Sequence, residues 1–192
     1  MSEVTKHQHF ILHKPYGYLS QLINNQNKRK NKRLLGELYD FPEGTMAIGR
    51  LDENSEGLLL LTTNGKVSET IRSTKVEKEY YAQVDGIITA EAIKQLQEGV
   101  EIGINGTKYT TKPCKVKSVS TVDTFPFADR KVRDARHGPM SWVSITLTEG
   151  KFRQVRKMTA AVGYPTLRLV RIRIGDILLK VNPGEVEERN SF

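Results

Sequence analysis

The sequence predicts an α+β protein built on one mixed, mainly antiparallel sheet with helices packed on its outside. Short segments that are apolar throughout, or that alternate apolar and polar residues, recur along the whole chain, as is typical of strands. The Asn105-Gly106 dipeptide between two such segments predicts a tight hairpin, and therefore antiparallel pairing. Helical patterns are few and short, and they fall between the strands.

The most informative stretch spans residues 46–65, MAIGRLDENSEGLLLLTTNG. Apolar runs at 46–48 and 58–61 predict two buried strands, and the polar residues between them predict a loop that carries Asp52 at the rim of the core. A carboxylate in this place can act as a base, a metal ligand or a nucleophile. It can equally cap backbone amides or pair with an arginine, and the spacing leaves these alternatives open.

The residues on either side of this stretch predict a strand at 7–14 and short helices at 34–39 and 66–72. His7, His9 and His13 would share one face of that strand. A metal site is not expected there, because no cysteine or carboxylate completes a set of ligands.

The middle of the chain predicts a strand at 78–86, whose alternation places Tyr80 on the inner face. Residues 89–98 begin with an N-cap threonine and continue with apolar residues at helical spacing. The hairpin strands then follow at 100–104 and 107–111. Nothing in the helix or the hairpin suggests chemistry, so we expect both to serve as scaffold.

The C-terminal part predicts a long basic loop at 124–140, a strand at 142–148, and a half-buried strand with a basic end at 166–175. Residues 182–192 are polar, and we expect them to be frayed.

A helix is predicted at 151–162, between those two strands, with basic residues on its outer side. Its predicted apolar stripe consists of Phe152, Val155, Thr159 and Val162.

The charge of the chain points to an anionic partner. Thirty Lys and Arg residues against 22 Asp and Glu give a formal net charge of +8, and residues 150–173 hold seven basic residues and no acidic one. The run KRKNKR at 28–33 is a second basic cluster, either a solvated loop or an RNA contact. The residues expected to contact RNA are Lys28, Arg29, Lys30, Arg33, Arg50, Lys151, Arg153, Lys157, Arg171 and Arg173.

Several classes of protein are not supported by the sequence. No apolar stretch is long enough to span a membrane and the N-terminus has no signal-peptide core, so a cytoplasmic location is expected. Dinucleotide-binding, phosphate-loop and zinc-binding motifs are missing from the sequence, so we expect neither a cofactor nor a metal. The single cysteine, Cys114, cannot form an internal disulfide.

Four motifs together resemble those of the RNA pseudouridine synthases of the RsuA type. They are HKPYGYL at 13–19, GRLDENSEG at 49–57, KEY at 78–80 and EGKFRQVRKM at 149–158. The match extends over most of the chain, and the last motif together with the residues after it resembles the RluE group of this family most closely.

The resemblance implies a single catalytic domain over residues 1–192, with the sheet in two interleaved halves, a catalytic cleft between them, and no RNA-binding module in front. In this family the residue at Asp52 attacks the target nucleotide, that at Tyr80 stacks on the target base, and that at Arg156 pairs with the aspartate. The implied activity is isomerisation of one uridine of large-subunit ribosomal RNA, by a cofactor-free monomer.

Two other functions compete with this interpretation. A non-catalytic protein that binds ribosomal RNA or assists ribosome assembly would explain the charge, but not the joint occurrence of the motifs. A glycoside-cleaving hydrolase would need a second carboxylate beside Asp52, for which Glu53 and Glu56 are the candidates.

Overall fold

A computed structural model describes residues 6–23, 31–73, 75–120 and 130–192. The described residues form a nine-stranded sheet, in which seven strands follow the order β13-β1-β5-β11-β6-β10-β9, with β4 paired to β5 and β12 to β11. These strands are β1 (His9–Lys14), β4 (Met46–Ala47), β5 (Glu56–Thr62), β6 (Lys78–Asp85), β9 (Lys115–Val119), β10 (Met140–Leu147), β11 (Thr166–Ile174), β12 (Ile177–Leu178) and β13 (Val186–Arg189). The predicted α+β class with a mixed sheet is confirmed.

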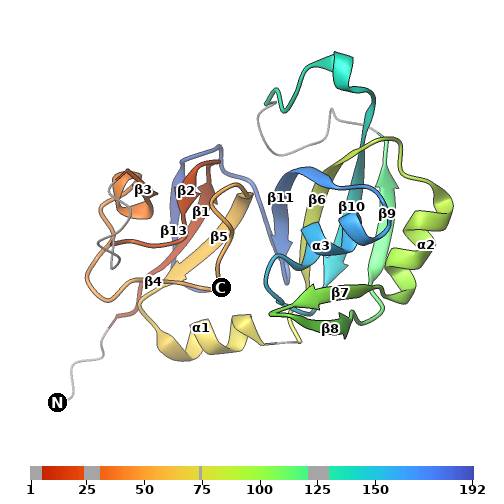
Figure 1. Cartoon of the computed structure of the whole chain (residues 1–192). Helices are drawn as coiled ribbons and strands as arrows, with labels where there is room; N and C mark the ends of the chain where they lie inside the picture. Colours follow the sequence, from red (N-terminus) through yellow and green to blue (C-terminus); the bar gives the residue numbers. More distant parts are fainter. Residues whose placement is uncertain (1–5, 24–30, 74, 121–129) are drawn as a thin grey trace.

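The sheet consists of two halves that meet at β5 and β11 (Figure 1). Pairing inside each half is antiparallel, whereas β5 and β11 run parallel over a short joint, with Val170 opposite Glu56 and Arg171 opposite Gly57. Gly57 has φ +105°, and a Cβ atom there would lie 2.3 Å from the carbonyl oxygen of Arg171. Only glycine therefore lets the two half-sheets approach this closely.

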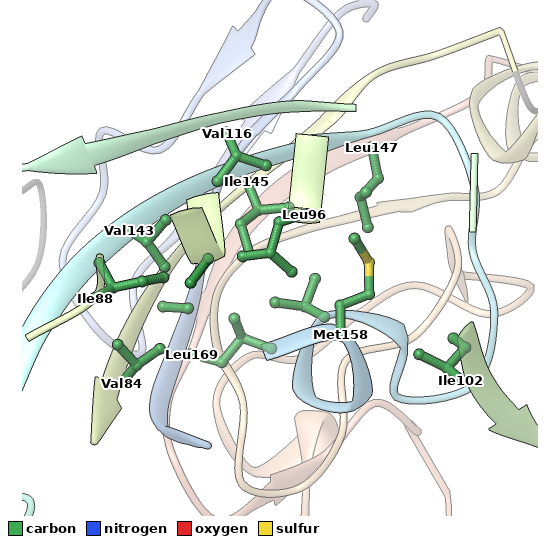
Figure 2. Packing of buried hydrophobic residues seen from close by; sticks show 13 residues of the cluster. Val84, Ile88, Leu96, Ile102, Val116, Val143, Ile145, Leu147, Met158 and Leu169 are labelled. Atoms are coloured by element: carbon green, nitrogen blue, oxygen red, sulfur yellow. The ribbon is translucent and has the colours of Figure 1, made fainter. Parts of the chain in front are cut away.

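We call β13-β1-β5 the N-terminal half and β11-β6-β10-β9 the C-terminal half. The larger core lies in the C-terminal half, between the sheet and two helices, α2 (Ala90–Glu98) and α3 (Gln154–Ala161). Figure 2 shows how Leu96 of α2 and Met158 of α3 converge on Ile145 and Leu169 of the sheet. The third helix, α1 (Gly65–Arg72), follows β5 directly and is capped by Asn64.

Two small sheets complete the fold: β2 (Tyr18–Leu19) with β3 (Arg33–Leu34), and the hairpin β7 (Glu101–Ile104) with β8 (Thr107–Thr110). The predicted hairpin is confirmed, and both residues of its Asn-Gly turn have positive φ, as a tight turn requires.

Several predicted elements differ in the structure. The helix expected at 34–39 is only a 3-10 turn, Leu35–Glu37, closed by the Glu37 carboxylate on the Leu34 amide. The expected strand at 142–148 begins two residues earlier, at Met140. The C-terminal residues were expected to fray, but part of them forms β13, whose backbone pairs with β1 at the edge of the sheet.

The helix expected at 151–162 begins later, at Gln154, because Arg153 before it adopts a left-handed backbone with φ +52°. The reversal turns Phe152 outward, and its side chain is 63% exposed. Phe152 is therefore not part of the apolar stripe; Met158, which is fully buried, takes that role beside Val155 and Thr159.

Candidate active site

The loop between β4 and β5 carries Asp52, and neighbouring backbone fixes its position. The Ser20 hydroxyl donates to the Leu51 carbonyl at 2.8 Å and accepts from the Leu51 amide at 2.9 Å. The Gly17 amide donates to the Glu53 carbonyl at 2.8 Å. Residues on both sides of Asp52 are thus held by the segment that follows β1, which keeps the carboxylate at a defined place.

The Lys14 side chain also holds this loop in place. Its ammonium group is buried and donates to three carbonyl oxygens, those of Pro15 at 3.0 Å, Tyr18 at 2.6 Å and Glu53 at 3.3 Å. Burial lowers the pKa of Lys14 to about 8. The lysine of the HKPYGYL motif therefore joins the turn after β1 to the loop of Asp52.

Two arginines from the start of α3 face the Asp52 carboxylate. Arg153 donates from Nη1 to Asp52 Oδ2 at 3.2 Å, and Nε of Arg156 lies 3.8 Å from the same oxygen. Arg156 also donates from Nη2 to the Asn54 carbonyl at 2.9 Å and to Ser55 Oγ at 3.1 Å. Arg156 thus forms the ion pair that the resemblance implied, but the shorter contact comes from Arg153, which was expected only to bind RNA.

The two arginines differ in their freedom to move. The Arg156 side chain is 11% exposed, whereas that of Arg153 is 36% exposed. Burial and the charge of Arg153 lower the pKa of Arg156, and the Asp52 carboxylate opposes this effect. Arg156 is therefore a fixed support of the loop, while Arg153 covers the carboxylate from the solvent side.

Tyr80 of β6 lies beside Asp52, at a hollow formed by both halves of the sheet. Its ring packs partly against the core cluster of the C-terminal half, which confirms that Tyr80 points to the inner face of its strand. We call this space the Tyr80 hollow. Its lining includes Arg50, Asp52, Tyr80, Glu149, Lys151 and Arg153.

Glu149 organises the turn that leads into α3, a role that the sequence did not reveal. Its carboxylate accepts hydrogen bonds from the Tyr109 hydroxyl, from the Lys112 amide at 3.0 Å and from Gln154 Nε2 at 2.8 Å. Burial opposes ionisation, but these hydrogen bonds outweigh it, so the pKa of Glu149 is lowered. Glu149 thereby ties the β7–β8 hairpin to the segment that carries Arg153.

Glu53 and Glu56 are both occupied by cations. Glu56 is buried and accepts from Arg168 at 3.0 Å and from Arg130 at 3.1 Å. Glu53 pairs with Lys32 at 2.6 Å. The pairing of both carboxylates with basic side chains disfavours a hydrolase that would use one of them beside Asp52.

The basic residues expected to contact RNA fall into distinct environments. Arg50 and Lys151 are exposed at the Tyr80 hollow, and Lys157 donates to the Gly103 carbonyl on the outer side of α3. Arg33 is exposed beside the Tyr18 ring.

Two further arginines lie on β11, one buried and one partly buried. Arg171 is buried and donates to the Leu58 carbonyl at 2.8 Å, and Arg173 pairs with Glu77 and Glu79. The expected half-buried strand is therefore buried along most of its length. Lys28, Arg29 and Lys30 lie outside the described residues.

Comparison with known proteins identifies the family. The family described as RNA pseudouridylate synthase matches residues 8–161 of the chain. The chain belongs to this family. It is an RNA pseudouridine synthase, an isomerase, as the resemblance implied.

Individual relatives support the same assignment. The chain is 40% identical to "Ribosomal large subunit pseudouridine synthase E" of Xanthomonas axonopodis pv. citri, over 86% of this chain and 85% of the relative. It is 39% identical to the protein of the same name from Xanthomonas campestris pv. campestris, over 91% of each. A solved structure titled "Crystal structure of pseudouridylate synthase" superposes with a TM-score of 0.74 at 27% identity, covering 98% of this chain and 73% of that one.

Two further features are absent from the described part of the chain. No group of His, Cys, Asp and Glu side chains there could hold a metal ion. None of the described helices is long and apolar enough to cross a membrane.

Proposed function

We propose that this synthase converts one uridine of large-subunit ribosomal RNA to pseudouridine, with Asp52 as the nucleophile. The names of the two Xanthomonas relatives support the choice of RNA. The single observation that supports the choice of residue is the placement of Asp52, which shares a hollow with Tyr80 and lies within reach of two arginines.

Binding requires the target base to leave its stack. A uridine in folded RNA has a glycosidic bond that protein side chains cannot reach, and extruding the base costs a few kcal/mol. Stacking on an aromatic ring stabilises the bound base by about 1–3 kcal/mol, which offsets this cost. Tyr80 offers such a ring next to Asp52, so the flipped uracil stacks there while its ribose meets the carboxylate.

The reaction is an isomerisation that balances without any other reactant. The Asp52 carboxylate attacks either the ribose or the pyrimidine ring, and the bond between N1 of uracil and the ribose breaks. The uracil rotates and forms a new bond from its C5 carbon to the same ribose carbon. The proton on C5 leaves, N1 gains one, and Asp52 is released unchanged.

The surrounding cations have separate tasks in this scheme. Arg156 holds the loop through Asn54 and Ser55 and keeps the Asp52 carboxylate oriented. Arg153 shields the carboxylate before RNA arrives, and its exposed guanidinium then turns to a phosphate of the bound strand. Arg50 and Lys151 at the same rim add phosphate contacts, which fix the register of the RNA.

The remaining basic residues extend this surface. Arg33, Lys157 and the run at 28–30 contact phosphates further along the RNA, without reading its sequence. The enzyme acts in the cytoplasm as a monomer and needs no cofactor.

The test is a map of pseudouridines in ribosomal RNA. Ribosomal RNA from cells lacking the protein is treated with a carbodiimide, and reverse-transcription stops are compared after re-supply of wild type, Asp52→Asn or Glu53→Gln. We expect one stop to be lost in the deletion and to return with wild type and Glu53→Gln, but not with Asp52→Asn. If Asp52→Asn restored the stop, Asp52 would not be the nucleophile. If the deletion left the pseudouridine map unchanged, the non-catalytic function would be favoured.

A further inference from the structure

Four aromatic side chains are exposed among the described residues, and two of them lie near Asp52. Tyr39 packs against Phe10 and Phe41, and Phe192 packs against the ring of His9. The other two are Tyr16, 49% exposed, and Phe152, 63% exposed. Both line a second hollow that also includes Asp52.

This second space, which we call the Phe152 hollow, adjoins the Tyr80 hollow. The two share Arg50, Leu51, Asp52 and Arg153 in their linings. A strand of RNA that places its target uridine beside Tyr80 therefore has a neighbouring nucleotide close to Phe152. Besides the shared residues, the lining of the Phe152 hollow includes Tyr16, Leu19, Gln21, Glu53, Asn54 and Phe152.

The exposure of Phe152 follows from backbone geometry. Arg153 is in the left-handed region, which few non-glycine residues adopt, and this conformation directs Phe152 away from the core. Strained conformations of this kind are maintained where the surrounding structure holds them, often at functional sites. Here the same turn presents Arg153 to the carboxylate and Phe152 to the adjoining hollow.

Each of the two rings also makes a cation–π contact. The Arg130 guanidinium lies 4.3 Å from the centre of the Tyr16 ring, and the Lys157 ammonium lies 5.2 Å from that of Phe152. Aromatic faces interleaved with cations are the combination that binds single-stranded nucleic acid. Both acidic residues of the hollow are paired with cations, Glu53 with Lys32 at 2.6 Å and Asp52 with Arg153 at 3.2 Å, which reduces their repulsion of a phosphate.

We propose that Phe152 and Tyr16 form a second nucleotide subsite, which stacks the base next to the target uridine. This inference rests on the proposed function, because it needs the target uridine to lie beside Tyr80. Stacking accepts any base, so the subsite stabilises the unstacked strand without reading its sequence. Arg130 and Lys157 beside the rings attract the phosphates of the same nucleotides.

The first test compares Phe152→Leu, which keeps apolar bulk without a ring, with Phe152→Trp, which keeps a stacking face. Phe192→Leu is the matched control, because it removes an exposed ring outside the hollow. The substrate is ribosomal RNA from cells lacking the protein. We expect Phe152→Leu to raise KM about 5- to 140-fold at unchanged kcat, from the worth of one stacked base. Phe152→Trp and Phe192→Leu keep the wild-type KM.

The second test places an abasic nucleotide beside the mapped uridine. We expect this change to raise KM for the wild type and to have little further effect on Phe152→Leu, because the two changes remove the same contact. An abasic nucleotide far from the target serves as the RNA control.

Failure of the subsite and failure of the proposed function give different experimental results. If the wild type forms pseudouridine while Phe152→Leu retains the wild-type KM, or if the abasic and Leu effects are additive, the subsite is refuted and the proposed function stands. If the wild type leaves every uridine unchanged, the proposed function fails and the subsite fails with it.

Discussion

Removing the negative charge of Glu56 should destabilise the joint between the two half-sheets. The Glu56 and Arg168 side chains are 6% and 3% exposed and form two parallel contacts of 3.0 Å. Arg130 adds a further contact of 3.1 Å to the same carboxylate. Glu56 begins the overlap with β11 at Val170, so its substitution to glutamine removes the negative charge that faces the buried Arg168 guanidinium at this joint.

The expected magnitude follows from the burial of the pair. Breaking a buried ion pair by removing one partner costs about 3–5 kcal/mol, because the remaining charge is desolvated and uncompensated. For a domain of this size, each kcal/mol lowers Tm by about 2–4 °C, so Glu56→Gln should lower Tm by about 6–20 °C. The control is Glu53→Gln, since the Glu53 and Lys32 side chains are 34% and 31% exposed and such pairs contribute less than about 1 kcal/mol.

The measurement is urea denaturation of the three proteins, followed by circular dichroism, with thermal scans alongside. Equal slopes against denaturant would show that the comparison reports stability alone. If Glu56→Gln unfolds within about 1 kcal/mol of Glu53→Gln, the buried pair does not support the joint, and the reasoning from burial is wrong.

Three further predictions concern Gly57, Cys114 and Lys14. Gly57→Ala should destabilise far more than Gly44→Ala in the same urea assay, because its Cβ would collide with the Arg171 carbonyl whereas Gly44, φ +81°, has open space and costs only about 1–2 kcal/mol. Burial raises the pKa of Cys114 to about 11, so mass spectrometry should find this thiol alkylated by iodoacetamide at pH 8 only after denaturation. Lys14 has a folded pKa of about 8 against 10.5 in the unfolded chain, so between these values the unfolded state binds more protons and stability rises with pH. Unfolding free energies measured from pH 7.5 to 10.5 should therefore increase in wild type relative to Lys14→Met, by at most about 3 kcal/mol; a constant difference would contradict the lowered pKa.

The parts of the fold that were predictable depend on local pattern. The alternation around Tyr80 determined which side of β6 faces the core, and the core cluster of the C-terminal half confirms it. The turn at Asn105 and the cap at Thr89 were also predictable, because each depends on residues within a few positions. Asp52 lies in a loop between two strands, as the flanking apolar runs indicated.

The backbone conformation at the start of α3 could not be predicted from periodicity. Helical spacing groups Phe152 with Val155, but the left-handed backbone at Arg153 breaks the period between them. The sequence gives no sign of a left-handed backbone at Arg153, because arginine has no preference for that conformation. The same backbone turn makes Arg153, rather than Arg156 alone, a direct partner of Asp52.

Long-range ion pairs were equally hidden in the sequence. Arg171 and Arg173 look like an exposed basic end, because the strand segment at 166–175 contains no acidic residue. Their actual partners are the Leu58 carbonyl and, for Arg173, Glu77 and Glu79, more than 90 residues away along the chain. Basic residues can be counted from a sequence, but their exposure depends on which strands become neighbours.

The arrangement of the site explains why the joint between the half-sheets matters for chemistry. The loop of Asp52 is held by the N-terminal half, through Ser20 and Lys14. The arginines that face Asp52 come from α3, which packs on the C-terminal half. The distance between the carboxylate and its cations is therefore set by how the two halves meet at Gly57. Because productive geometry tolerates only small displacements, a change at this joint should lower turnover without touching any group that contacts RNA.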